Sequence, residues 1–132
     1  MEIVWSLIIA GVVMGVLDAL WLGVVAKTLY YRELGGLLRE KPNMAAALAF
    51  YVIYVVGVVV FVIHPALQAS SLVHAALYGL LFGFVAYATY DLTNLATVKN
   101  FSSKIVMIDL VWGAVITAVV SSLTYIGVTW LV

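Results

Sequence analysis

The chain alternates between four long apolar runs and three shorter polar connections. Each run has about the 20 mostly apolar residues that a helix needs to cross the hydrocarbon core of a bilayer. Helices are expected because unpaired backbone groups are costly in lipid. The predicted spans cover residues 3–26, 44–63, 72–98 and 105–131. This pattern predicts an all-α, polytopic membrane protein with a single transmembrane domain over residues 1–132.

The longest polar connection lies between the first two spans, at residues 27–42. Apolar Tyr30 and Leu34 alternate there with Arg32 and Glu33. This alternation predicts a short amphipathic segment that lies in the membrane interface.

Composition supports the membrane class and excludes several others. The chain is 67% hydrophobic and only 9% charged, whereas soluble domains are about 25% charged. Its net charge is zero, so we expect no nucleic-acid partner and take the lipid bilayer as its environment. The absence of cysteine excludes disulfides, thiolate metal sites and thiol nucleophiles. The sequence identifies no cofactor and no metal site.

The basic residues are distributed very unevenly along the chain. Both termini and the second connection lack lysine and arginine, and all six lie in or at the edges of the first and third connections. They are Lys27, Arg32, Arg39, Lys41, Lys99 and Lys104. Positive residues mark cytoplasmic loops. We therefore predict a multi-pass protein of the inner (plasma) membrane, with both termini outside.

Three aspartates, Asp18, Asp91 and Asp109, are the only charged side chains well inside the predicted spans. A carboxylate at the centre of a membrane helix costs roughly 2.5–3.5 kcal/mol and is by default a functional candidate. Their spacing from the nearest lysine puts all three roughly 7–14 Å inside the cytoplasmic boundary, at 1.5 Å per residue. If the first, third and fourth helices adjoin, the acids can share one pocket that faces the cytoplasm.

No basic residue is expected at the depth of these acids, so three carboxylates together would repel one another strongly. Either one or more of them is protonated at neutral pH, or a cation sits among them, or water reaches them. A single buried acid often only bonds a neighbouring helix. Three at one depth favour a functional cluster.

Neutral hydrogen-bonding groups lie one helical turn from each acid. Trp21 follows Asp18 by three residues, Trp112 follows Asp109, and Asn94 follows Asp91, so each pair shares a helix face. Tyr90 directly precedes Asp91. These groups can donate to carboxylates or stack on a flat or cationic ligand. The predicted proton- or ligand-binding residues are Asp18, Asp91, Asp109, Trp21, Tyr90, Asn94 and Trp112.

Two further patterns have structural interpretations. The pairs Gly11/Gly15 and Gly79/Gly83 permit close helix contact. Hydroxyl side chains give the fourth span a polar character, and we expect them to bond their own helix backbone. They are Thr117, Ser121, Ser122 and Thr124.

The segment Tyr-Asp-Leu-Thr-Asn at residues 90–94 carries a resemblance to a known family, together with Asp-Leu-Val-Trp at 109–112 and Asp-Ala-Leu-Trp at 18–21. On these motifs the chain resembles a family of small predicted four-helix membrane proteins of unknown function found in prokaryotes. The resemblance covers nearly the whole chain. It implies the architecture and brings no activity.

The leading functional hypothesis is a small carrier of protons or cations, or of a cationic or hydrophobic solute, which uses the aspartate and aromatic pocket. One alternative is a membrane enzyme or enzyme subunit that acts on a lipid or isoprenoid, with the carboxylates as acid/base groups or Mg²⁺ ligands. A third is a structural subunit of a membrane complex. A catalytic site should open sideways to lipid, whereas a carrier needs access from both faces. We also expect a homo-oligomer, with the dimer as the simplest form.

Overall fold

A computed structural model describes residues 1–25, 27–37 and 43–132, and within these ranges it contains helices and turns but no strands. Four helical stretches are long and apolar enough to cross a membrane: Glu2–Val24, Met44–Gln68, Leu72–Thr97 and Ser103–Leu131. The all-α, polytopic prediction is therefore confirmed.

The four spans are built from seven helical elements. The first span is α1 (Glu2–Leu20) followed by the π-helical turn η1 (Trp21–Val25). The second is α3 (Met44–Val58), a π-helical turn η3 (Val59–Ile63) and α4 (His64–Gln68). The third and fourth are α5 (Leu72–Thr97) and α6 (Ser103–Leu131).

The connection between the first two spans is itself helical where the structure describes it. It forms α2 (Lys27–Leu34) and a short 3-10 turn, η2 (Gly35–Leu37). The rest of the predicted interfacial segment, residues 38–42, lies outside the described residues.

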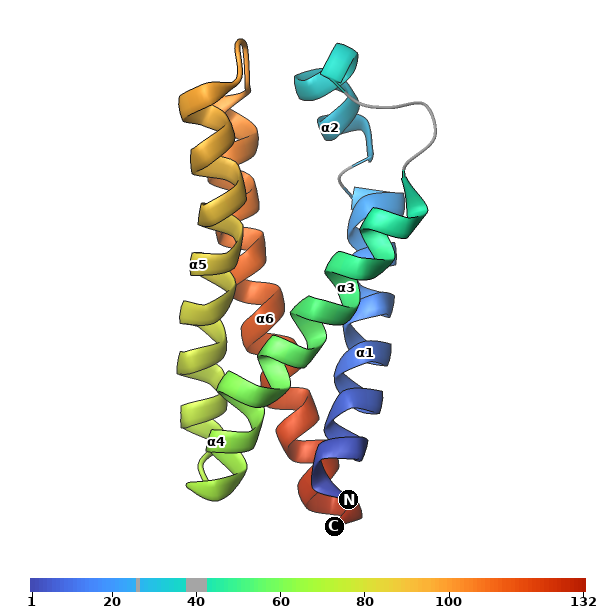
Figure 1. Ribbon diagram of the computed structural model, residues 1–132, viewed down its shortest axis with the longest axis vertical. Coiled ribbons are helices and arrows are strands. Elements are labelled where there is room, and N and C mark those ends of the chain that lie inside the picture. The colour runs from blue at the N-terminus through green and yellow to red at the C-terminus, as the bar shows by residue number, and fades with distance from the viewer. Residues whose placement is uncertain (26, 38–42) are drawn as a thin grey trace.

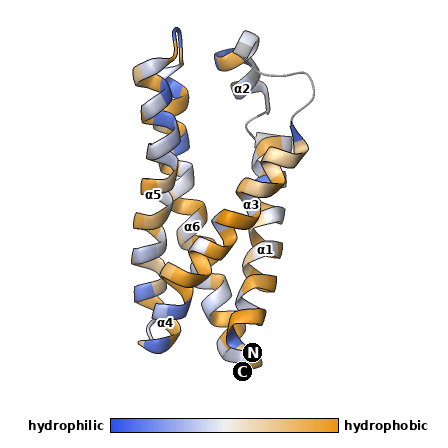
Figure 2. Ribbon diagram, viewed as in Figure 1, coloured by the Kyte–Doolittle hydropathy of each residue, from blue (hydrophilic) through white to orange (hydrophobic). Residues whose placement is uncertain are grey.

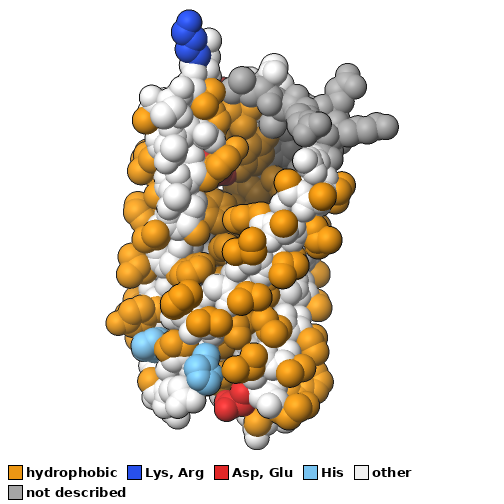
Figure 3. All heavy atoms as spheres, in the orientation of Figure 1, with side chains coloured by type: hydrophobic (Ala, Val, Ile, Leu, Met, Phe, Trp, Pro, Cys, Tyr) orange, Lys and Arg blue, Asp and Glu red, His pale blue; other side chains and the backbone are white. Residues whose placement is uncertain are grey.

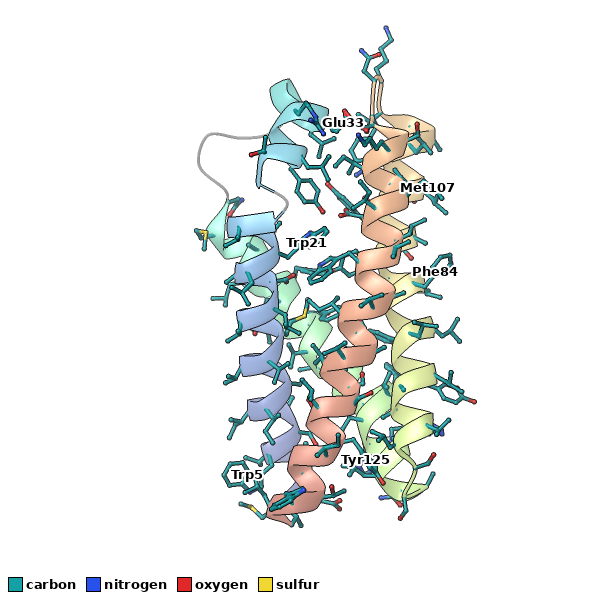
Figure 4. The ribbon with its side chains drawn as sticks, turned by 180° about the vertical axis from the view of Figure 1, so that it is seen from behind. Trp5, Trp21, Glu33, Phe84, Met107 and Tyr125 are labelled. Carbon is teal, nitrogen blue, oxygen red and sulfur yellow. The ribbon has the colours of Figure 1, made fainter. Side chains whose placement is uncertain are left out.

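Figure 1 shows both termini at one end of the bundle, with α2 and the turn between α5 and α6 at the other end. Figure 2 shows hydrophobic residues over most of the bundle and hydrophilic ones gathered towards its ends. In Figure 3 the two histidines lie at the end that holds the termini, and the visible lysine and arginine side chains lie at the opposite end. Trp5 and Tyr125 also lie at the end with the termini (Figure 4), as expected of an aromatic belt at one membrane surface.

Three helices begin at a residue whose side chain caps the first turn. The side chains of Asn43, Ser71 and Ser102 accept hydrogen bonds of 3.2, 3.0 and 3.2 Å from the backbone N–H three residues later. Such caps satisfy amide groups that have no partner within the helix. The local sequence therefore sets where α3, α5 and α6 start.

The second span runs past its predicted end at Ile63 and continues to Gln68. Pro65 has no N–H to donate, and its ring crowds the carbonyl four residues earlier. The wide π-helical turn Val59–Ile63 ends two residues before Pro65 and provides the local adjustment that keeps the chain helical. Proline thus modifies this helix without ending it.

Helix α6 is central, because it packs against both α1 and α5. The contact with α5 is close at two glycines. A Cβ atom on Gly79 would lie 2.8 Å from the Ser121 hydroxyl oxygen, and one on Gly83 would overlap the carbonyl of Gly113. Glycine is therefore required for α5 and α6 to approach this closely.

The other glycine pair receives a side chain from α3. The Tyr51 hydroxyl donates to the carbonyl of Gly11 and would lie 3.1 Å from a Cβ on Gly15. Both glycine pairs are therefore used within the chain.

Candidate functional site

Asp91 on α5 and Asp109 on α6 lie beside each other in the interior of the bundle. Asp91 is fully buried, with 0% of its surface exposed, and Asp109 is 9% exposed. Neither carboxyl oxygen of Asp91 has a hydrogen-bond partner among the described residues. Buried polar atoms without a partner are rare, and each calls for an explanation such as a proton, an ion or water.

Tyr30 on α2 connects the acid pair to the first span. Its hydroxyl donates to one oxygen of Asp109 and accepts a 3.4 Å hydrogen bond from the indole N–H of Trp21. Burial and the hydrogen bond with Asp109 raise the pKa of the Tyr30 hydroxyl above its ordinary value. Tyr30 therefore stays neutral and can act as a donor.

Trp21 on η1 and Trp112 on α6 form a parallel stack. Their ring centroids are 4.2 Å apart and their planes differ by 9°, and Figure 4 shows Trp21 directed from the first span towards α6. Asp18 interacts with the Trp112 side chain and lies close enough to Asp109 for their charges to interact. The stack thus holds the third acid next to the pair.

The same two indoles line an apolar groove with a volume of about 510 Å³. Its remaining walls are Met107, Ile108, Val111 and Val115 of α6. Met107 and Val111 are 64% and 62% exposed, so the groove faces the surroundings of the bundle and not its core. The indoles that line it also interact with the polar cluster, Trp112 with Asp18 and Trp21 with Tyr30.

Two tyrosines, the buried Tyr54 and the half-buried Tyr87, extend the polar cluster away from the acids. The Tyr87 ring lies against Gly113, where a Cβ would overlap it, and Tyr87 is near Asp18, Asp109 and Tyr54. The rings of Tyr54 and Tyr87 meet edge to face, with centroids 6.5 Å apart.

The structure brings together five of the seven residues that the sequence singled out: Asp18, Trp21, Asp91, Asp109 and Trp112. Asn94 is half-buried one turn after Asp91. Tyr90 is 63% exposed and meets Phe101 edge to face. The position next to Asp91 therefore turns the Tyr90 side chain away from the buried cluster.

The acids do not gather into a metal site. Within the described ranges, no three acidic or histidine side chains lie close enough to hold one metal ion. None of the groups that interact with the three acids in this part of the chain is basic. The arrangement is a carboxyl pair with a nearby third acid, surrounded by neutral donors.

Tyr30 is the member of the cluster that the sequence did not indicate. It belongs to the connection between spans and was expected only to place its ring in the interface. One signal was present: α2 is amphipathic and begins just after the first span, so its apolar face must find cover. A tyrosine on that face brings a hydroxyl group with it.

The comparisons with known proteins agree with the architecture. The model of the family described as "Predicted membrane protein (DUF2177)" matches residues 3–126. No curated protein and no solved structure matches the chain. The family description names no activity, and it confirms the resemblance to a family of predicted membrane proteins. With its four spans and a match over nearly its whole length, the chain belongs to the DUF2177 family of predicted membrane proteins.

Proposed function

We propose that this protein is a small carrier of protons or cations, and that the proton is the species its carboxyl pair binds. The observation that carries the proposal is Asp91, which is fully buried with both oxygens unpartnered among the described residues. Asp109 lies beside it and accepts from Tyr30.

Physical chemistry favours a shared proton at this pair. Two unit charges 4 Å apart repel by roughly 4 kcal/mol at an effective dielectric constant of 20. One proton held between the two carboxyl groups removes this repulsion and supplies a donor for an oxygen that has none. Intramembrane acids of this kind mark proton relays in pumps and transporters.

In the proposed carrier, the other residues shape the site. Tyr30 and Trp21 hold Asp109 in place through their hydrogen bonds, while the Trp21–Trp112 stack shields the acids from the apolar groove. Asp18 adds a second carboxyl group within charge range of Asp109. Tyr90 is exposed and Asn94 is half-buried, so neither belongs to the buried pair itself.

We propose that protons reach the carboxyl pair from the end of the bundle that carries the basic residues, and we assign this end to the cytoplasmic side of the plasma membrane. Figure 3 shows the molecule hollowed between α5 and α3, below α2. A polar pocket of about 360 Å³ lies at the same end and is lined by Arg32, Glu33 and Lys99, among others. Both features support hydration from this side.

The test is proton flux into liposomes that contain the full chain. A potassium diffusion potential drives protons inward, and a trapped pH-sensitive dye reports their arrival. Asp91→Asn and Asp109→Asn should reduce flux to the rate of protein-free liposomes. Glu2→Gln is the matched control, because it also neutralises an acid but lies at the first residue of α1, outside the acid cluster. Wild-type flux in both aspartate variants would refute the proposal.

A second candidate is an enzyme or enzyme subunit that acts on a lipid or isoprenoid. The observation that favours it is the apolar groove beside Trp21 and Trp112, which opens sideways. The carboxyl pair would then serve in acid/base chemistry. Incubation of the protein with membrane lipid extracts, followed by mass spectrometry, distinguishes this candidate by the appearance of a product that Asp91→Asn does not form.

A further inference from the structure

We propose that a line of buried hydroxyl groups along α6 conducts protons between the Asp91–Asp109 pair and the end of the bundle that holds the termini. This inference rests on the proposed function and names the route through which the proton would leave or reach the pair.

The buried polar residues of α6 lie on one face of the helix. They are Asp109, Thr117, Ser121 and Thr124, of which Asp109 is 9% exposed and the three hydroxyl residues are 0% exposed. With Gly113 included, successive positions from Asp109 to Thr124 are four, four, four and three residues apart. This spacing keeps them on one face of an α-helix. We call these three hydroxyl residues the hydroxyl line.

The first part of the route connects the acids to the hydroxyl line. Tyr87 lies near Asp109 and Tyr54. The hydroxyl groups of Tyr54 and Thr117 are hydrogen-bonded to each other, and Thr117 donates at 2.8 Å to the carbonyl of Gly113. The Tyr87 and Tyr54 hydroxyl groups are therefore the links that we assign between the carboxyl pair and Thr117.

The second part consists of Ser121 and Thr124, and their bonding differs from the expectation drawn from the sequence. Thr117 bonds its own helix backbone as expected. The hydroxyl oxygens of Ser121 and Thr124 are buried and have no hydrogen-bond partner among the described residues. Buried hydroxyl groups in this condition are ordinarily satisfied by water.

The spacing of the line sets how a proton would move along it. Three to four residues of helix rise about 4.5–6 Å, which exceeds the length of about 2.8 Å of a hydrogen bond between two oxygens. One water molecule between successive hydroxyl groups closes each gap. At each step an oxygen accepts a proton from one side and releases its own proton to the other, so only O–H bonds break and form.

The surroundings of the line exclude larger species. Ile116, Val120 and Val128 are at most 1% exposed, and Ser121 faces Gly79 at close range. A hydrated metal ion or an organic cation would have to displace these side chains, whereas a proton passed between oxygen atoms would not. The route therefore selects the proton over the other solutes that an acidic pocket could bind.

The experiment measures proton flux in the liposome assay for variants of the line and for matched controls. Ser121→Ala and Thr124→Val remove hydroxyl groups from the line. Ser122→Ala and Thr129→Val remove the same groups from positions off it, since Ser122 is only half-buried and Thr129 is exposed. Thr124→Ser keeps a hydroxyl group at residue 124 and is the conservative counterpart of Thr124→Val. Thermal melting of each variant reports whether its fold is retained.

We expect Ser121→Ala and Thr124→Val to lower flux by roughly tenfold to a hundredfold, the rate effect of one lost hydrogen-bonding link in a buried path. Ser122→Ala and Thr129→Val should keep wild-type flux, and Thr124→Ser should conduct faster than Thr124→Val. If Ser121→Ala and Thr124→Val both conduct like the wild type while Asp91→Asn does not, the route is wrong and the proposed function stands. Wild-type flux equal to that of protein-free liposomes would overturn both.

Discussion

The substitution Gly83→Ala tests the contact that brings Asp91 and Asp109 together. A Cβ on Gly83 would overlap the carbonyl oxygen of Gly113 and the side chain of Thr117. Both belong to the buried face of α6, so the clash is relieved only if α5 and α6 move apart. Overpacking of this kind costs about 1–3 kcal/mol, while alanine regains up to about 1 kcal/mol of helix propensity over glycine.

The expected net result is a loss of about 1–2 kcal/mol in the free energy of unfolding, measured by circular dichroism as the fraction of SDS in mixed micelles is raised. Gly23→Ala is the matched control, since no atom lies within 4 Å of a Cβ at that position. It should be neutral or slightly stabilising. Proton flux should fall for Gly83→Ala alone, because the carboxyl pair is pulled apart. A Gly83→Ala variant as stable as the Gly23→Ala control would refute the description of this helix contact.

Three further predictions concern Tyr30, membrane orientation and assembly. An unfolded tyrosine ionises near pH 10, whereas Tyr30 stays protonated in the fold because its pKa is raised. The contribution of Tyr30 to the free energy of unfolding therefore declines as the pH rises past about 10. In thermal melts between about pH 9 and about pH 11, Tyr30→Phe should lose less stability than the wild type. The chain has no cysteine, so an impermeant maleimide should label Val132→Cys from outside the cell and Ser103→Cys only after permeabilisation, and the reverse pattern would invert the orientation. Native mass spectrometry from mild detergent should show a homodimer, and a purely monomeric spectrum would contradict that prediction.

The spans and the level of the acids could be predicted from the sequence because both depend on distance along a helix. A run of about 20 apolar residues must cross the bilayer, and the position of Asp18, Asp91 and Asp109 within such runs sets their depth. The condition for a shared pocket was that the first, third and fourth spans adjoin, and in the structure α6 packs against both α1 and α5.

The rest depends on contacts that local patterns do not encode. The sequence placed Trp21 and Trp112 on the faces of their aspartates, but their stacking requires the particular approach of α1 to α6. Tyr30 reaches Asp109 because α2 folds back over the bundle, which no periodicity within α2 reveals. Tyr90 is adjacent to Asp91 in sequence, yet one residue is about 100° of rotation around an α-helix, and this turns it outward.

The structure also changes which surfaces of the chain could form the predicted dimer. Small-residue pairs such as Gly11/Gly15 and Gly79/Gly83 can supply helix contacts either within a chain or between copies. The structure uses the first pair against Tyr51 and the second against α6. A dimer would therefore need another surface, and the exposed apolar faces of the outer helices are the ones that remain.

The central claim is that the buried pair Asp91–Asp109 holds a proton, and infrared difference spectroscopy tests it most directly. The carbonyl stretch of a protonated carboxyl group is distinct from the bands of a carboxylate and shifts on exchange into D₂O. At neutral pH the wild type should show this band, Asp91→Asn and Asp109→Asn should lose it, and Glu2→Gln should keep it. A wild-type spectrum at neutral pH without a protonated carboxyl band would contradict the account.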